Sequence, residues 1–317
     1  MRLSSVANSC CGAKQWLLSP CILVVAGVPL LLSCDKQFDS HSEEAHGFPE
    51  YVLVAGTELE YVEIGNLTRS PRVAKGDIRG DIVVFLNGNP VARLVNSCGF
   101  TVTPFLREGI NTLRLKGDSP QQFKVGLTVS RKVTAEMYSF EDVCVKEIQP
   151  TECESVDVTI PFLVTRAAQN PVLGMHSPGD RDAVEAELKE WLEGINQLIR
   201  FKRYGELYKA VFQYKDLWQA DNYGGFAEQR QRDTWLERQR ENWLNQTAQT
   251  GFILFTINIP DIRFVYGPNL ILAYDQSVRE DDLNRQGVIM AAFGSGRKHS
   301  IVDYLRLATV DGEWKAY

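Results

Sequence analysis

The chain has few histidines and no surplus of positive charge, and both shortages limit its chemistry. Its 317 residues include 4 histidines, 34 lysines and arginines, and 40 acidic residues, for a formal net charge of −6. Nucleic-acid affinity depends on many phosphate contacts from Lys and Arg, so an acidic chain without a basic stripe excludes nucleic acid as a partner. Histidine is the most frequent general acid or base, and the C-terminal half has only His176 and His299.

Motifs for metal binding and nucleophilic catalysis are also missing. The sequence has no helical pair of histidines, no serine-elbow motif and no clustered set of four zinc ligands. We therefore expect no metal and no cofactor. The Gly294-Ser295-Gly296-Arg297 run lies between two expected strands rather than between a strand and a helix, which favours a hairpin turn over an anion-binding loop.

The long apolar run, residues 16–33, is a poor membrane-spanning helix. It covers 18 residues and contains two prolines and a glycine, whereas a bilayer core requires roughly 20 apolar residues. No positive cluster follows it to stop transfer through the membrane. An uncleaved anchor and a plain cleaved signal peptide are the alternatives to the interpretation that follows.

The end of this run has the features of an export signal. Arg2 and Lys14 precede the apolar residues, and the run closes on Leu31-Leu32-Ser33-Cys34-Asp35. This pattern resembles the lipobox of bacterial lipoproteins. The resemblance implies that residues 1–33 are a signal peptide and that Cys34 is lipidated and becomes the mature N-terminus. It also implies sorting to the inner membrane through Asp35, with the outer membrane as the alternative.

Lipidation of Cys34 would hold the protein on the periplasmic face of a membrane. Two or three acyl chains bind a bilayer stably, whereas one chain binds it reversibly. The mature chain would have 284 residues, of which 32 are basic and 40 acidic, so its charge would be −8. Anionic headgroups would repel it weakly, which makes the anchor more necessary. Residues 34–49 are polar and are expected to form a tether.

Three cysteines lie beyond the predicted lipidation site: Cys98, Cys144 and Cys153. An exported protein meets an oxidising compartment in which disulfides form. Cys144 and Cys153 enclose a short segment and are the candidate pair, which would leave Cys98 free. The alternative is three unpaired buried thiols.

Residues 50–164 have the pattern of an all-β domain. Short apolar or alternating runs separated by turn residues predict an all-β sandwich. Asn87-Gly88-Asn89 predicts a tight hairpin, because Asn and Gly tolerate positive φ. Residues 102–113 contain a phrase that resembles the L-x-x-G-x-N-x-L turn and strand of jelly-roll sandwiches, including galactose-binding-like modules. By that resemblance, Gly109 and Asn111 make the corner. The expected strands are 51–54, 59–64, 82–86, 91–95, 111–115, 123–129 and 156–162.

The composition shifts toward Asn, Pro and Gly in residues 165–179, which we interpret as a linker. Three segments with helical periodicity follow, and Asp180 or Asp182 can cap the first of them. After residue 250 the pattern changes to short extended runs. Residues 180–317 are therefore expected to form an α+β domain, with helices packed on a curved antiparallel sheet. The whole chain is predicted to be multi-domain.

The end of the chain carries a second resemblance. Tyr304-Leu305-Arg306-Leu307 is followed by Asp311-Gly312-Glu313-Trp314-Lys315, and this order resembles nuclear-transport-factor-2-like and ketosteroid-isomerase-like domains. The resemblance covers residues 180–317 and implies a cone-shaped pocket, in which enzyme members place an acid or base, such as an aspartate with a tyrosine. The candidates are Tyr208, Asp216, Tyr274 and Asp275. The alternatives are a core position for Tyr208 and a solvated helix position for Asp216.

Together these features predict a membrane-anchored periplasmic lipoprotein with a non-catalytic role. It would bind a protein, glycan or small molecule, or serve as a structural component in envelope assembly. The alternative is an enzyme that acts on a small molecule in the cone pocket. An enzyme needs a deep pocket that holds a buried carboxylate or tyrosine, whereas an assembly protein needs a contiguous exposed apolar patch.

Overall fold

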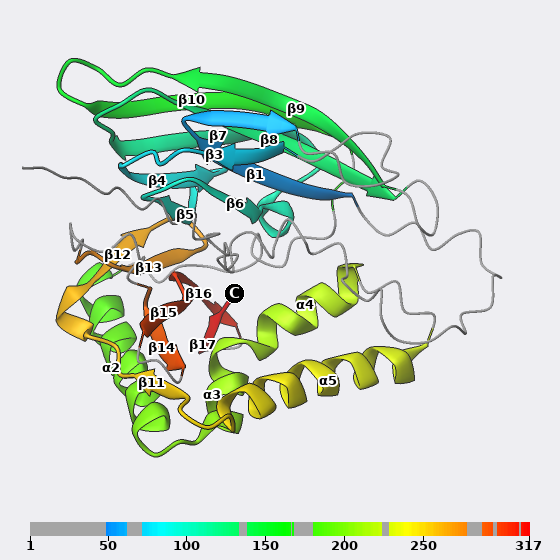
Figure 1. Ribbon diagram of the computed structural model, residues 1–317, viewed down its shortest axis with the longest axis vertical. Coiled ribbons are helices and arrows are strands. Elements are labelled where there is room, and N and C mark those ends of the chain that lie inside the picture. The colour runs from blue at the N-terminus through cyan, green and yellow to red at the C-terminus, as the bar shows by residue number, and fades with distance from the viewer. Residues whose placement is uncertain are drawn as a thin grey trace, which may run out of the picture.

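The computed structural model describes residues 49–61, 72–132, 138–165, 167, 180–223, 228–277, 287–293, 297–310 and 312–317. Antiparallel sheets dominate, and the helices lie in the C-terminal part (Figure 1). We refer to residues 49–167 as the first segment and to residues 180–317 as the second segment. The predicted signal peptide, Cys34, Asp35, the tether up to residue 48 and the linker residues other than 165 and 167 lie outside the described residues.

The first segment forms two four-stranded antiparallel sheets and a separate hairpin. One sheet has the order β6-β1-β8-β9, the other has the order β10-β7-β4-β5, and β2 pairs with β3. The strands are β1 (Glu50–Gly56), β2 (Glu58–Tyr61), β3 (Arg72–Lys75), β4 (Asp81–Leu86), β5 (Asn89–Leu94), β6 (Cys98–Thr101), β7 (Gly109–Asp118), β8 (Phe123–Lys132), β9 (Tyr138–Ile148) and β10 (Ser155–Val164), with a 3₁₀ turn η2 (Thr103–Phe105) after β6.

Two local predictions in this segment are confirmed. Asn87 and Gly88 have φ values of 52° and 84° and connect β4 to β5 as a two-residue hairpin. Asn111 is fully buried, and its amide donates to the carbonyls of Arg107 and Gly109 at 2.7 and 3.0 Å. Its oxygen accepts from the Arg107 N–H at 3.0 Å, so Gly109 and Asn111 make the corner from which β7 begins.

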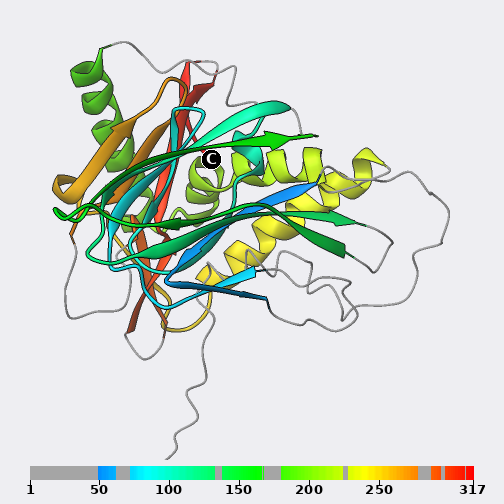
Figure 2. The same ribbon diagram turned by 90° about the horizontal axis from the view of Figure 1, so that it is seen from above.

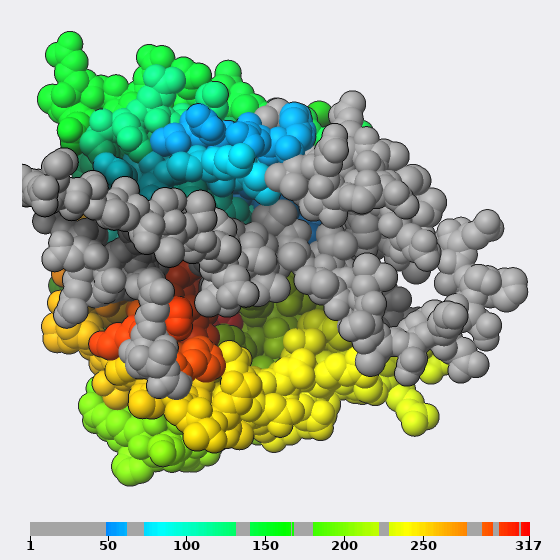
Figure 3. Space-filling view, in the orientation of Figure 1, coloured from blue at the N-terminus to red at the C-terminus, as the bar shows by residue number. Residues whose placement is uncertain are grey.

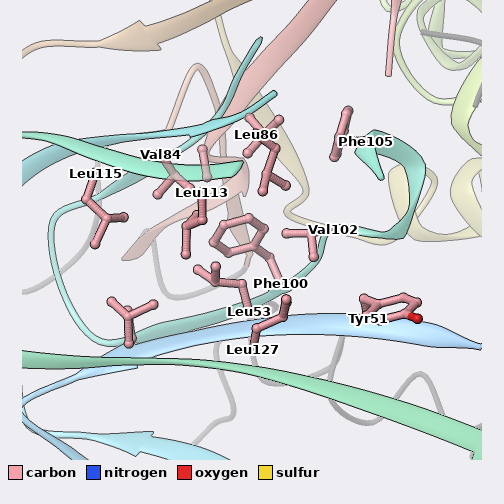
Figure 4. Close-up of a cluster of buried hydrophobic side chains, with 14 of the residues drawn as sticks. Tyr51, Leu53, Val84, Leu86, Phe100, Val102, Phe105, Leu113, Leu115 and Leu127 are labelled. Atoms are coloured by element: carbon pink, nitrogen blue, oxygen red, sulfur yellow. The ribbon is translucent and has the colours of Figure 1, made fainter. Parts of the chain in front are cut away.

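The two sheets contribute side chains to one core. Leu53 and Leu127 from the first sheet face Val84 and Leu113 from the second, and all four are fully buried (Figure 4). Burial of each such side chain stabilises the fold by about 1.5–3 kcal/mol. The alternation along β7, in which every second residue is buried, follows from this arrangement because one face of the strand meets the core.

The second segment consists of helices followed by antiparallel strands. Its sheets have the orders β11-β14-β15 and β12-β13-β16-β17. The helices are α2 (Arg181–Arg200), α3 (Tyr204–Val211), α4 (Gln213–Tyr223) and α5 (Gln229–Thr247). The strands are β11 (Ile253–Phe255), β12 (Ile262–Tyr266), β13 (Ile271–Asp275), β14 (Ile289–Phe293), β15 (Arg297–Val302), β16 (Tyr304–Val310) and β17 (Glu313–Ala316), with a 3₁₀ turn η4 (Ile259–Asp261) before β12.

Helix α2 begins where the sequence predicts. The Asp180 carboxylate accepts from the backbone N–H groups of Asp182 and Ala183 at 3.1 and 3.4 Å, so Asp180 is the N-cap. Residues on one stripe of the helix are buried in a core that also contains Leu207, Trp243 and the strands of the second segment.

The structure differs from the expected elements in one helix and in strands β3, β6 and β9, none of which lies in an expected range. The second of the three segments with helical periodicity, residues 207–218, forms two helices divided at Phe212, whose ring lies 4.7 Å from that of Trp243 on α5. Strand β9 was not expected, because its charged residues hide the alternation. It is the edge strand of its sheet, where one row of backbone groups has no neighbour and charged side chains meet solvent.

The core of the first segment continues into the second. Trp218, Leu270, Ala308 and Tyr317 are buried in the same cluster as the residues between the two sheets of the first segment. Figures 1 and 2 both show the second segment lying against these sheets. In Figure 3 the first segment, in blue and green, lies above the second, in yellow and orange. The two predicted units are therefore in close contact.

Candidate functional site

An arginine from each segment reaches across to the other. Arg93 on β5 has 7% of its side chain exposed, and its Nε lies 2.7 Å from Asp81 Oδ1. Its Nη1 donates to the backbone carbonyl of Asp275 on β13, and the guanidinium lies 4.3 Å from the ring centroid of Tyr274. Arg93 thus binds two residues of the second segment while its charge is balanced within the first.

Arg306 on β16 makes the reciprocal contact. Its Nε donates to the Val91 carbonyl at 2.6 Å, and its guanidinium lies 4.9 Å from the ring centroid of Phe105. The β4–β5 register shifts between Val84 and Phe85, so Val91 has no partner in the ladder. The Val91 carbonyl would otherwise be buried without a hydrogen-bond partner, which costs folding free energy. Arg306 supplies the missing donor at this bulge on the edge strand β5.

The turns at the ends of two hairpins also meet here. The Asn269 N–H donates to the Asn89 side-chain oxygen at 2.9 Å. A Cβ on Gly267 would lie 2.5 Å from Pro90 Cδ and 2.9 Å from Asn89 Cα, so only glycine fits. We call Asn89, Arg93, Gly267, Asp275 and Arg306 the segment interface.

Two of the predicted pocket residues, Tyr274 and Asp275, lie at this interface. Tyr274 is buried beneath the Arg93 guanidinium, and the Asp275 carboxylate accepts from the Ser277 backbone N–H at 2.8 Å. Tyr208 belongs to the separate core of the second segment. The structure therefore does not bring the four candidates into one site.

The other two candidates, Tyr208 and Asp216, do meet. The Tyr208 hydroxyl on α3 donates to Asp216 Oδ2 on α4 at 2.5 Å. Tyr208 is 5% exposed, and its ring lies 6.2 Å from that of Phe212 in a stacked arrangement. The break at Phe212 turns α4 so that the carboxylate reaches the hydroxyl. The predicted core position for Tyr208 is correct, and its polar end has the partner that a buried tyrosine needs.

Burial dominates the electrostatics of this pair. It raises the pKa of Tyr208, and the hydrogen bond to Asp216 raises it further, because a carboxylate favours the protonated phenol. Burial also raises the pKa of Asp216, although the Tyr208 hydroxyl and the Lys215 ammonium act in the opposite direction. A carboxyl with a raised pKa beside a tyrosine is the arrangement that acid–base chemistry uses, but each of these groups is bonded to the other.

Replacing Asp216 with asparagine tests this electrostatic description. The folded protein holds the Asp216 proton more tightly than the unfolded chain, in which the pKa is near its ordinary value of 3.8. The carboxyl's contribution to stability is therefore fully present below that value and is lost as the pH rises through the raised pKa. We expect Asp216→Asn to gain stability relative to the native protein between about pH 4 and pH 7, measured by urea unfolding.

Asp157→Asn is the control, because the pKa shift of this carboxyl has the opposite sign. Arg114 hydrogen-bonds to Asp157 and lowers its pKa, so the stability that this carboxylate adds is present above its ordinary pKa and lost in acid. This pH dependence lies below about pH 4 and the exposed pair contributes little, so the variant should differ from the native protein by a small and constant amount between about pH 4 and pH 7. If the difference between Asp216→Asn and the native protein were flat across this range, the Asp216 carboxylate would not be desolvated.

None of the three cysteines Cys98, Cys144 and Cys153 forms a disulfide with a described residue. Cys98 and Cys144 are half-buried on β6 and β9, and Cys153 is exposed in the turn before β10. Burial raises the pKa of the Cys144 thiol, which lowers its reactivity. A disulfide between Cys144 and Cys153 stays a prediction.

Sequence reasoning missed Arg93 and Arg306, although a signal for them exists. Each interrupts an apolar strand, Arg93 in Pro90-Val91-Ala92-Arg93-Leu94 and Arg306 in Leu305-Arg306-Leu307. A charged residue within such a run is rarely buried unless it is paired. The pattern indicates a buried arginine but does not name its partner, because the contacts join residues 182 and 215 positions apart.

Among the described residues, no three His, Cys, Asp or Glu side chains lie close enough together to hold a metal ion. Within the same residues, no helix is long and apolar enough to cross a membrane. Comparison of the chain with family models, with curated proteins and with solved structures found no match.

Proposed function

We propose that this protein is a lipid-anchored bacterial lipoprotein of the periplasm with a non-catalytic binding or envelope-assembly role. Cys34 carries the anchor, and Asp35 directs the protein to the inner membrane, with the outer membrane as the alternative. The first segment is a β-sandwich, which is supported by its two four-stranded sheets and their common core. The second segment is a nuclear-transport-factor-2-like α+β domain, which is supported by its order of helices before antiparallel strands.

The segment interface is the observation that favours a binding role. The reciprocal arginines and the shared core hold the two segments in one arrangement. A fixed arrangement keeps a composite surface ready for a protein, glycan or small-molecule partner, because little ordering is then needed on binding. The candidate acid and base groups, Tyr208 and Asp216, are bonded to each other.

The anchor is tested by replacing Cys34 with serine in the full chain. The native protein should sediment with membranes, and its N-terminal peptide should begin at Cys34 with the added mass of acyl chains. The Cys34→Ser protein should not acquire this mass, because only a thiol accepts the diacylglyceryl group. The measurement is mass spectrometry of the N-terminal peptide, combined with fractionation.

Cys21→Ser is the matched control, since it changes a cysteine within the apolar run and leaves Cys34 in place. It should be acylated like the native protein. Recovery of an unmodified native peptide that contains residues before Cys34 would contradict the lipoprotein proposal.

The second candidate function is an enzyme acting on a small molecule in the second segment. The Tyr208–Asp216 hydrogen bond favours it, because it places a phenol beside a carboxyl whose raised pKa suits it to donating a proton. Such an enzyme would need a substrate to displace one partner from the other. Loss of a measured activity in both Tyr208→Phe and Asp216→Asn would support this function over the binding role.

A further inference from the structure

Residues just after α2, at the start of α3 and near the end of α5 line a basic pocket. Figure 1 shows these helices in the lower part of the view. The volume of the pocket is about 490 Å³, and it is open to solvent. Four cations line it, Lys202, Arg203, Lys209 and Arg240, against one carboxylate, Glu206. The lining therefore carries a charge of +3 on a chain whose formal net charge is −6.

Not all of this charge is available to a ligand. Arg203 forms a two-point ion pair with Glu206, and Arg240 Nη1 lies 2.6 Å from Glu237 Oε1. Lys202 and Lys209 form no ion pair with any described residue. Arg240 Nε is buried without a hydrogen-bond partner among the described atoms. Within the part of the chain that the structure describes, the pocket thus keeps two ammonium groups without an ion pair and one guanidinium N–H without an acceptor.

The backbone at Lys202 is the second observation. The chain leaves α2 through a Schellman turn, in which the Lys202 N–H donates to the Ile199 carbonyl at 3.1 Å and the Arg203 N–H donates to the Leu198 carbonyl at 2.8 Å. Lys202 has a φ of 54° in this turn, a position at which glycine is the preferred residue. Lysine is less favourable for folding than glycine at this φ. The backbone therefore gives no reason for a lysine here, and we look for one in what its ammonium group can bind.

The pocket is held open by its frame. Trp243 is buried, and its indole N–H donates to the Tyr204 carbonyl at 3.0 Å, which fixes α5 against the first turn of α3. A Cβ placed on Gly205 would have no atom within 4 Å, so the space above this turn is empty. Leu244 and the Tyr204 ring add apolar surface to the lining. Both walls are therefore in place before a ligand arrives.

We propose that this pocket binds a phosphate group carried on an organic molecule. Lysine ammonium and arginine guanidinium groups are the usual partners of phosphate, and the adjacent Tyr204 and Leu244 give an organic substituent a surface to contact. The pocket volume falls within the range of small-ligand sites. The phosphate belongs either to a soluble phosphomonoester or to a lipid headgroup. This inference rests on the proposed binding role and gives it a ligand class.

The test is calorimetric titration of the intact chain with phenyl phosphate. Lys202→Gly should weaken binding about ten-fold, because it removes one charged hydrogen bond, and added salt should weaken binding further. The same variant should unfold at a temperature no lower than the native protein, since glycine suits the φ of 54°. Weaker binding without lower stability separates a ligand contact from a structural role.

Arg79→Gly is the matched control, because Arg79 also carries a positive charge at a φ of 52° but lies in the first segment, away from the pocket. It should leave the affinity unchanged. A second pair uses two helical glycines with open space above them: Gly205→Leu should block the pocket, whereas Gly194→Leu should not. An equal loss of affinity in the two members of either pair would overturn the proposal.

A vesicle experiment distinguishes the two sources of phosphate. The Cys34→Ser chain, which has no acyl group, is mixed with vesicles of phosphatidylglycerol and phosphatidylcholine. Binding to these vesicles that Lys202→Gly abolishes, without binding of phenyl phosphate, would support the lipid headgroup. Binding of phenyl phosphate alone would support the soluble ester. Absence of both, or benzoate binding as tightly as phenyl phosphate, would overturn the phosphate site whatever the fate of the anchor.

Discussion

Replacing Arg93 with alanine is expected to lower the free energy of unfolding by about 3 kcal/mol. The side chain is almost fully buried, and its loss removes the ion pair with Asp81, the hydrogen bond to the Asp275 carbonyl and the contact with the Tyr274 ring. Asp81 is 42% exposed and can be rehydrated, which keeps the loss at the lower end for a broken buried pair. The measurement is urea unfolding, accompanied by scanning calorimetry.

Arg114→Ala is the matched control for this prediction. Arg114 also places its Nε 2.7 Å from an aspartate oxygen, that of Asp157, but both side chains are about half exposed. Water replaces such a pair at little cost, so this variant should unfold close to the native midpoint. Two separate calorimetric transitions in Arg93→Ala would indicate that the segments uncouple. Equal stability of the two variants would contradict the buried interface.

Replacing Gly267 with alanine is expected to destabilise the protein by about 1–3 kcal/mol through overpacking. The added Cβ would lie 2.5 Å from Pro90 Cδ and 2.9 Å from Asn89 Cα, both of them atoms of β5. A backbone atom and a proline ring cannot rotate aside, so the turn before β13 must move away from β5. This movement would also strain the hydrogen bond from the Asn269 N–H to Asn89. Thermal and urea unfolding measure the effect.

Gly194→Ala adds the same methyl group and is expected to change the stability in the opposite direction. Gly194 lies on the exposed face of α2, and nothing lies within 4 Å of an added Cβ. Alanine favours the helix over glycine by up to about 1 kcal/mol, so this variant should be more stable than the native protein. If Gly267→Ala were as stable as Gly194→Ala, β5 and the β12–β13 turn would not be in contact in solution.

The position of β5 at the edge of its sheet explains why substitutions at Arg93 and Gly267 should lower the stability. An edge strand presents unpaired backbone groups, and the bulge at Val91 turns one carbonyl out of the ladder. Arg306 binds this carbonyl, and the second segment covers the edge. Loosening the interface would therefore expose a strand that can pair with other chains. We expect destabilised variants to aggregate more readily for the same reason.

Features that depend on near neighbours could be predicted from the sequence. The Asn87-Gly88 hairpin, the Asn111 corner and the Asp180 cap each depend on a few adjacent residues, because turn and cap conformations are set by local φ preferences and local hydrogen bonds. The alternation of β7 follows from the period of a strand with one buried face. The pattern at Cys34 that resembles a lipobox is likewise local, and its role stays a prediction.

Contacts between residues distant in the sequence depend on the tertiary structure. Tyr208 and Asp216 were both predicted as candidates, but only the break at Phe212 brings the two side chains together. Arg93 reaches Asp275 across 182 positions, and Arg306 reaches Val91 across 215. Local pattern indicates caps, tight turns and strands with one buried face, but it did not indicate the edge strand β9. The packing of the whole chain sets which buried charge meets which carbonyl, because that pairing depends on surfaces that exist only after both segments have folded.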